Sequence, residues 1–312
     1  MKPNVRISSI VKDYGVWIIL VVLFIVLSML DKNFLSQTNV ISILRQCAPY
    51  AILAFGINFV IIAGGIDLSG GAVIALSSCV VAMLMVYGHL NMWLAVPLAI
   101  LVGGLCGLFN GFAISKLKVP FFLTTVAMMY LARGIALVVS KENTITGLPA
   151  GFAIFGGTTK FFLPPQVVIA VIVFIVLYII LNHTKTGRYT YALGSNTPMA
   201  RLSGINVDLQ LMKVYMIAGL CAGIAGVIMA ARMKSGSPII ADGMQLDAIC
   251  AVAIGGTSMK GGAGKLQNTI AGSLVLTIIR SGLNMLAISS SVQQIIIGAL
   301  IVIVVAVDLR KK

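Results

Sequence analysis

The chain has 312 residues, of which 59% are hydrophobic and only 10% are charged, and its formal net charge is +14. A water-soluble domain carries about 25% charged residues, so a soluble globule of this composition is excluded. In lipid, backbone groups are satisfied only within helices or closed barrels, and long apolar stretches favour helices. We therefore expect an all-helical, polytopic membrane protein in which residues 1–312 form a single transmembrane domain.

The excess of lysine and arginine does not indicate a nucleic-acid-binding protein. The basic residues are scattered singly between apolar stretches, whereas a nucleic-acid site gathers them on one face. Scattered basic loops are typical of a membrane protein whose cytoplasmic connections attract positive charge. The sequence therefore predicts a lipid bilayer, and no nucleic acid, as the surroundings of the chain.

Apolar stretches bounded by polar residues, glycine or proline predict ten spans, where a full crossing needs about 20 residues. In chain order these spans cover residues 15–30, 46–64, 71–87, 92–115, 120–139, 166–182, 211–231, 245–258, 266–286 and 291–308. If the N-terminus is cytoplasmic, fourteen basic residues lie in inner segments, six lie in outer segments, and Arg133 and Arg280 lie within spans. This bias predicts that both ends of the chain are cytoplasmic.

Two connections are longer than the rest. Residues 140–165 form a turn-rich loop on the predicted outer side, and residues 183–210 form a loop on the predicted cytoplasmic side. In the inner loop, Asn196 can cap a helix, Pro198 suits a first helical turn and Gly204 can end the helix. We expect a short helix along the cytoplasmic face there.

Two glycine-rich motifs resemble each other. Residues 62–71 read IAGGIDLSGG and residues 253–262 read AIGGTSMKGG, so each has two glycine pairs separated by four residues. Interrupted helices at matching places in two halves of a chain are typical of a transport route. Close-packed helix turns also need such small residues, so both interpretations stay open.

The first motif contains Asp67, one of only eight acidic residues in the chain. In the predicted topology it lies near the inner end of the second span, where its side chain can cap the start of the third. Whether Asp67 is structural or lies on a solute route stays open. Arg133 and Arg280 lie about two helical turns from an outer span end, and they either extend to the outer surface or line a polar route for a hydroxylated solute.

Catalytic chemistry is not indicated by any motif. The pattern GGAGK, residues 261–265, lacks the spacing of a phosphate-binding loop, and no zinc-protease or nucleophile motif is present. Acidic relays are nearly missing from the predicted spans, which argues against a proton-coupled carrier without excluding one. An ion-coupled secondary carrier, a passive solute channel and a permease driven by a separate ATPase remain as alternatives.

Several separated motifs, in the right order, resemble one family. GGIDLSGG resembles the GGIDLSVG signature of permease subunits in bacterial ABC importers for ribose, xylose, galactose and related sugars. The outer loop and the C-terminal part also match. The remaining stretches that carry the resemblance are FLSQTNVISILRQ (34–46), TGLPAGF (146–152), TGRYTYALGSNTPMARLSGINV (186–207), LDAICAVAIGGTSMKGGAGK (246–265) and the segment 281–308.

The resemblance implies a ten-helix importer permease in the bacterial cytoplasmic (inner) membrane, which is not itself an enzyme. It implies a second permease copy, an ABC ATP-binding subunit that holds ATP and Mg, and an extracytoplasmic sugar-binding protein, with no cofactor on this chain. The outer loop near Gly147 would face the binding protein. The residues that would couple the permease to the ATPase are Gly194, Asn196, Arg201, Leu202, Ser203 and Gly204.

For the solute route, mild polar side chains within the predicted spans are the candidates. Each of them also suits a helix–helix hydrogen bond, worth about 0.6 kcal/mol in a membrane. The candidates are Asn58, Asp67, Ser69, Asn110, Thr124, Thr125, Asn284 and Gln294. The identity of the sugar, and whether the dimer pairs identical or sister permeases, do not follow from the sequence.

Overall fold

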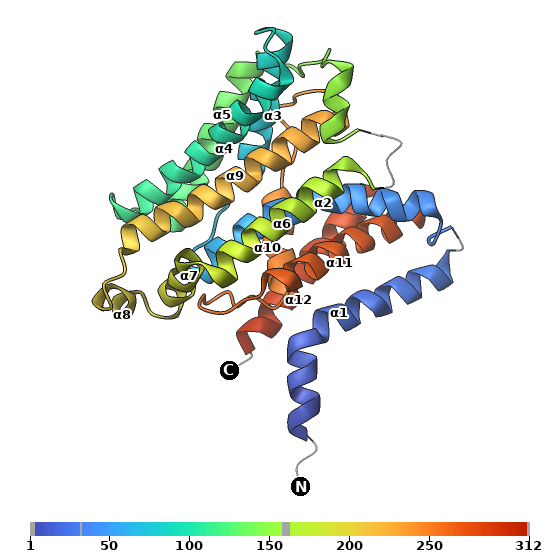
Figure 1. The fold of residues 1–312 in the computed structure, drawn as a ribbon. Coiled ribbons are helices and arrows are strands. Elements are labelled where there is room, and N and C mark those ends of the chain that lie inside the picture. Colours follow the sequence, from blue (N-terminus) through green and yellow to red (C-terminus); the bar gives the residue numbers. More distant parts are fainter. Residues whose placement is uncertain (1–3, 32, 158–162, 311–312) are drawn as a thin grey trace.

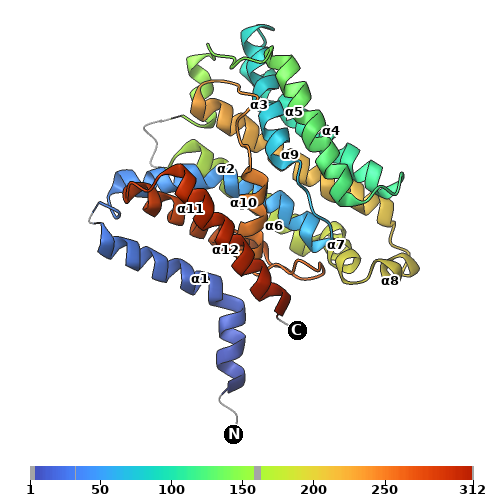
Figure 2. The same ribbon diagram turned by 180° about the vertical axis from the view of Figure 1, so that it is seen from behind.

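The protein folds into a bundle of helices, seen from two sides in Figures 1 and 2. The computed structural model describes residues 4–31, 33–157 and 163–310, and these contain no named strand. In chain order the elements are α1 (Asn4–Leu30), α2 (Gln37–Ile62), α3 (Gly70–Val86), α4 (Met92–Ser115), α5 (Phe121–Ser140), η1 (Ala150–Phe155), α6 (Pro165–His183), α7 (Lys185–Ser195), α8 (Thr197–Leu202), α9 (Val207–Met233), α10 (Met244–Ile254), α11 (Leu266–Met285) and α12 (Ser290–Arg310).

Each of the ten predicted spans coincides with a helix, and α7, α8 and the 3-10 helix η1 are additional. Some predicted boundaries are wrong: α2 begins at Gln37 rather than at residue 46, and α10 ends at Ile254 rather than at 258. Five helices, α2, α4, α5, α6 and α9, are long and apolar enough to cross a membrane by length and composition. The multi-pass character of the chain follows from these helices, while ten crossings stay a prediction.

The centre of the bundle is formed by α2, α3 and α9. From Cys47 to Ile62 every residue of α2 except Tyr50 is buried, and α9 packs against α2, α3 and α4. The outer helices α1, α4, α5 and α6 instead leave large apolar side chains exposed, such as Leu105, Leu131 and Ile172. Apolar residues that cover the outside as well as the inside are what a lipid solvent requires.

Glycine sets the distance between α4 and α9, the pair of helices with the most extensive packing. A Cβ atom at Gly103 would lie 2.5 Å from the carbonyl oxygen of Gly219, and one at Gly107 would clash with the carbonyl group of Tyr215. Lipid tails are as apolar as leucine, so helices associate in a membrane through such close backbone packing rather than through the hydrophobic effect.

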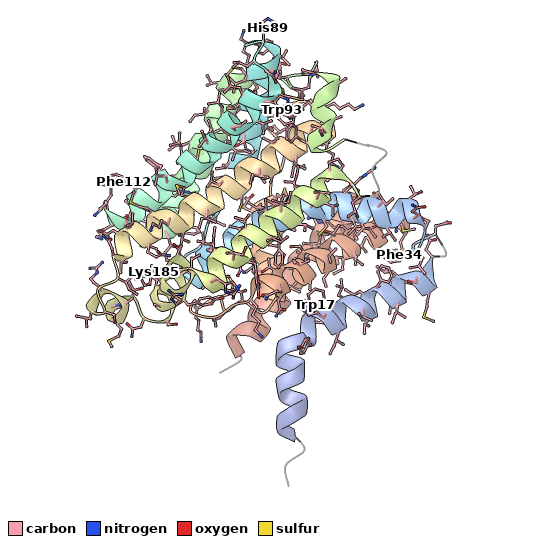
Figure 3. The ribbon with its side chains drawn as sticks, viewed as in Figure 1. Trp17, Phe34, His89, Trp93, Phe112 and Lys185 are labelled. Carbon is pink, nitrogen blue, oxygen red and sulfur yellow. The ribbon has the colours of Figure 1, made fainter. Side chains whose placement is uncertain are left out.

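The two ends of the bundle carry different segments. The start of α1, the end of α12, and α7 and α8 lie towards one side, while the α3–α4 connection projects at the other (Figures 1 and 2). Figure 3 shows the labelled His89 and Lys185 far apart along the bundle, in agreement with this arrangement. An even number of crossings requires both ends of a chain to lie on one side.

On the side away from α7, the outer loop is tied to the α9–α10 connection. Ile145 and Gly236 exchange two backbone hydrogen bonds of 2.8 and 2.9 Å, and Phe155 of η1 packs edge-on against Trp93. Part of the predicted loop 140–165, residues 158–162, lies outside the described residues.

The glycine packing of α4 on α9 leads to a prediction. Gly107→Ala should destabilise the fold by about 1–3 kcal/mol, because the new methyl group meets backbone rather than a flexible side chain. Gly134 of α5 is the matched control, because a Cβ atom there would meet nothing within 4 Å. Gly134→Ala should be neutral or stabilising, since alanine favours helix by about 1 kcal/mol. Thermal unfolding of the purified variants in detergent measures both, and equal melting temperatures would contradict the close-packing argument.

Candidate functional site

The two glycine motifs, far apart in the sequence, meet at the end of α7. The N–H group of Gly262 donates a 2.9 Å hydrogen bond to the carbonyl oxygen of Ile62, the last residue of α2. A Cβ atom at Gly194 would collide with both of these groups, and one at Gly261 would lie 2.9 Å from the Cα atom of Gly64. We call this meeting point of Gly64, Gly194, Gly261 and Gly262 the glycine junction.

Positive φ angles explain why glycine occupies the two motif segments of the junction. Gly64, Gly261 and Gly262 have φ of +83°, +84° and +74°. This region is open to glycine without steric cost and is disfavoured for residues with a side chain. The glycine pairs therefore turn the chain after α2 and before α11 while letting three backbones touch.

Side chains next to the junction strengthen the same connection. The hydroxyl of Tyr191 on α7 donates to the carbonyl oxygen of Gly264 at 2.8 Å. The buried hydroxyl of Thr257 donates to Oδ1 of Asn58 at 2.9 Å, linking the end of α10 to α2. Sequence reasoning selected Asn58 and missed Tyr191 and Thr257, because their partners lie far away in the sequence.

The predicted short helix is confirmed as α8. Asn196 caps it by accepting a 3.0 Å hydrogen bond from the N–H group of Met199, and Pro198 stands in its first turn. Gly204 follows the helix with φ +79°. Leu202 is 83% exposed although it is apolar.

Asp208, in the first turn of α9, connects α8 to the loop between α4 and α5. Its carboxylate lies 3.0 Å from Nζ of Lys116, 3.4 Å from Nζ of Lys118 and 4.0 Å from the guanidinium of Arg201. Three cations around one carboxylate hold α8, α9 and the α4–α5 loop together. Asp208 therefore connects α8 to the loop before α5, and α7 connects α8 to the glycine junction.

Asp67 belongs to a buried chain of polar groups. Its Oδ1 accepts from the N–H of Ser69 at 2.8 Å and from the Ser69 hydroxyl at 2.6 Å, and Nδ2 of Asn110 donates to the same hydroxyl oxygen at 3.1 Å. The expectation that Asp67 caps α3 directly needs correction. Ser69 holds the cap position, and Asp67 shapes the turn that precedes it. The three residues, all buried, fix α3 against α4.

The two arginines within spans have different surroundings. Arg133 is held by the α9–α10 connection, through the carbonyl oxygens of Pro238 and Ile240 and, at 3.3 Å, the carboxylate of Asp242. Arg280 forms a 2.6 Å ion pair with Asp247 of α10. The guanidinium of Arg280 lines a polar cavity, and its side chain stays 33% exposed.

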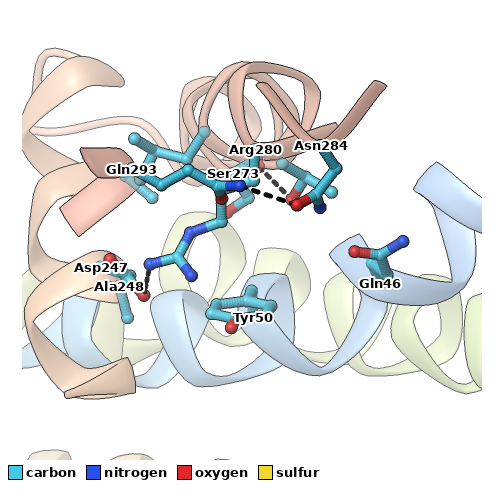
Figure 4. A pocket seen from close by; sticks show the side chains of 11 residues that line it. Gln46, Tyr50, Asp247, Ala248, Ser273, Arg280, Asn284 and Gln293 are labelled. Atoms are coloured by element: carbon cyan, nitrogen blue, oxygen red, sulfur yellow. Dashed lines mark hydrogen bonds and ion pairs between the residues drawn. The ribbon is translucent and has the colours of Figure 1, made fainter. Parts of the chain in front are cut away.

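That cavity has a volume of about 120 Å³ and lies between α2, α10, α11 and α12. Figure 4 shows Asp247 and Arg280 joined on one side of it and Gln293 bonded to Asn284 on another. The ring of Tyr50 lies 5.8 Å from the guanidinium carbon of Arg280. The predicted candidate Asn284 is part of this wall, while Gln294 is exposed and its neighbour Gln293 is turned inwards.

The remaining route candidates, Thr124 and Thr125, are buried on α5. Their hydroxyls donate to carbonyl oxygens one turn back in the same helix, at 3.1 Å for Thr124 and 3.0 Å for Thr125. Such bonds satisfy a hydroxyl in an apolar environment. Seven of the eight candidates thus fall into four places, which are Asn58 beside the junction, the Asp67 chain, the cavity at the other end of the bundle, and α5. The eighth, Gln294, is exposed and belongs to none of them.

A bundle of apolar helices in which two interrupted motifs meet is characteristic of membrane transport proteins, and comparisons with known proteins agree. The family model described as "Branched-chain amino acid transport system / permease component" matches residues 39–305. The chain belongs to this family, and within it to the permeases of ABC sugar importers.

Three curated relatives are similar over almost their whole length. The chain is 38% identical to the ribose import permease protein RbsC of Bacillus subtilis, over 99% of this chain and 97% of the relative. It is 34% identical to the D-allose transport system permease protein AlsC of Escherichia coli, over 95% and 91%. It is 33% identical to the L-arabinose transport system permease protein AraH of Escherichia coli, over 100% and 94%. The comparison with solved structures gave no match.

The Asp67 chain leads to a second prediction. Asp67→Asn keeps an oxygen where Oδ1 accepts from Ser69, so the folded protein should survive. Asp67→Ala removes the acceptor and should destabilise by about 1–3 kcal/mol, the cost of leaving buried polar groups unpaired. Melting temperature and transport in vesicles together measure this. If both variants fold equally well and both lose transport, the carboxylate charge matters and the structural role is refuted.

Proposed function

We propose that this chain is the membrane-spanning subunit of an ATP-driven importer that moves a neutral monosaccharide delivered by an extracytoplasmic binding protein. The relatives named for ribose, allose and arabinose support the solute class. The observation that carries the proposal is the glycine junction. There the predicted coupling segment, residues 194–204, contacts both glycine motifs through the backbone of Gly194. On this proposal, ATP and Mg are bound by a separate cassette subunit.

The coupling step follows from the contacts of α7 and α8. Arg201 and Leu202 of α8 are exposed for the cassette subunit, with Ser203 and Gly204 completing that surface. Displacement of α8 reaches the junction through α7, and it reaches the α4–α5 loop through Asp208. A cassette that binds α8 differently in its two nucleotide states shifts the permease between two conformations, as any such switch requires.

The solute route is proposed to lie between two permease copies in the inner membrane. Described polar side chains in the spans are mostly uncharged or paired, which suits a solute that must leave as readily as it enters. Selectivity then resides in the binding protein. Asn58, Thr124 and Thr125 are buried within the single chain, so on this proposal they meet the solute only after the helices rearrange. The outer loop near Gly147 would face the binding protein.

Reconstitution separates this proposal from its alternatives. The permease, a cassette subunit and a binding protein together should import a monosaccharide only with ATP and Mg. An ion-coupled carrier would transport without the cassette when given an ion gradient, and a passive channel would equilibrate the solute without either. Transport by the chain alone would overturn the proposal.

The orientation of the coupling segment gives a third prediction. In a variant without the five native cysteines, Ser203→Cys should react with an impermeant maleimide only after cells are opened. Glu142→Cys, on the opposite side of the bundle, should react in intact cells. Both side chains are exposed, so access to the reagent depends on the side of the membrane. Labelling of Ser203→Cys in intact cells would reverse the proposed topology.

A fourth prediction concerns coupling. In the double variant Arg201→Ala with Leu202→Ala, the sugar-stimulated ATPase activity should fall about tenfold or more. The reason is that hot-spot contacts at an interface are worth about 2 kcal/mol or more each. Leu209→Ala, a half-exposed leucine on the same side but outside the coupling segment, is the control. Normal stimulated activity in the double variant, with the control also normal, would remove α8 from the coupling surface.

A further inference from the structure

The cavity between α2, α10, α11 and α12 lies inside one chain and away from the coupling segment. Its walls come from the first half of α2, the first two turns of α10, the middle and end of α11, and the start of α12. The opposite ends of α2 and α10 lead to the glycine junction. The cavity therefore lies at the other end of the same two helices that meet α7.

The charges that face this cavity cancel. Arg280 and Asp247 form a 2.6 Å ion pair, in which the carboxylate uses Oδ2. In the part of the chain that the structure describes, Asp247 Oδ1 has no hydrogen-bond partner, so it can accept a hydrogen bond from a ligand hydroxyl. Among the residues that line the cavity, Arg280 is the one cation, and its Nη2 is already paired with the Asp247 carboxylate. The charge pattern thus favours a neutral ligand.

Polar groups of both kinds line the rest of the wall. Nε2 of Gln293 donates to Oδ1 of Asn284 at 2.8 Å, which leaves the Gln293 carbonyl and the Asn284 amide nitrogen as a free acceptor and a free donor. Gln293 and Asp247 are each only 8% exposed. Planar amide, carboxylate and guanidinium groups beside an aromatic ring suit a polyol, whose hydroxyls both donate and accept and whose C–H face packs on the ring. Hydrogen bonds to charged groups are about twice as strong as neutral ones.

We propose that this cavity is a binding site for one molecule of a neutral monosaccharide within a single permease chain. The inference takes from the proposed function only the class of solute. The site is separate from a route between two copies, because every wall belongs to one chain. A sugar bound here would contact the halves of α2 and α10 that lie away from the glycine junction.

The test uses the full chain in lipid nanodiscs, without cassette subunit or binding protein, and measures binding of tritiated D-ribose, D-allose and L-arabinose. Gln293→Leu should weaken binding of the preferred sugar about tenfold, the effect of losing about 1.4 kcal/mol of hydrogen bonding. Gln294→Leu is the matched control, since it makes the same change one residue along on an exposed side chain. Glucuronate, which is anionic, should not compete.

Asn284→Leu serves as a second variant, and a single sharp melting transition establishes that each variant is folded. Undetectable binding of all three sugars to the wild-type chain overturns the inference, as does equal binding by the Gln293→Leu and Gln294→Leu variants. Either result leaves ATP-driven import untouched if the reconstituted importer still works. Conversely, sugar binding by a chain that a cassette subunit cannot drive would overturn the proposed function and leave the cavity site standing.

Discussion

The structure depends on how two interrupted helices satisfy their backbone groups inside the bundle. A helix that ends away from water leaves carbonyl groups unpaired, and in a membrane each unpaired group costs several kcal/mol. Here the carbonyl of Ile62 at the end of α2 is met by the N–H of Gly262 after α10. The two breaks therefore stabilise each other, and Gly194 is small enough for α7 to close over both. This mutual pairing fixes the position of the end of α7.

A second regularity is that the acidic groups inside the bundle have partners. Asp67 accepts two hydrogen bonds from Ser69, and Asp247 is paired with Arg280. At the bundle surface Asp208 gathers three cations and Asp242 lies 3.3 Å from Arg133. Breaking a buried pair by removing one partner typically costs about 3–5 kcal/mol. Exposed pairs, such as those of Asp208 and Asp242, contribute much less. The buried acids Asp67 and Asp247 therefore do more to hold segments in place, and Asp247 and Arg280 also shape a cavity.

The positions of the helices could be predicted from hydropathy because lipid and core both select apolar residues. The α8 helix was predictable as well, since Asn196, Pro198 and Gly204 carry local capping chemistry. The start of α2 was not, because residues 37–45 are polar enough to resemble a loop but still form helix. Contacts across the bundle, such as that of Thr257 with Asn58, depend on how each helix is rotated about its axis. When a helix is apolar on all sides, its sequence does not show which face points inwards.

Gln293 and Gln294 illustrate the same limit. Neighbouring residues on a helix point about 100° apart, since one turn takes 3.6 residues. The sequence shows two glutamines side by side, whereas in the structure one lines the cavity and the other is exposed. Asp67 is a different case, because its hydrogen bonds to Ser69 are local in the sequence and could be predicted from it. The bond from Asn110 to Ser69 depends on how α4 packs, which the sequence does not show.

The glycine junction also separates two tasks along the inner loop. Its contacts are made by main-chain atoms, which every residue type shares, whereas the outward surface of α8 consists of side chains. Substitutions on α8 can therefore change its exposed side chains without altering the main-chain contacts of the junction. Within the junction the reverse holds, since any added side chain can only obstruct. Among permeases that share the glycine junction, substitutions should accumulate on the exposed face of α8, while the glycines of the junction stay unchanged.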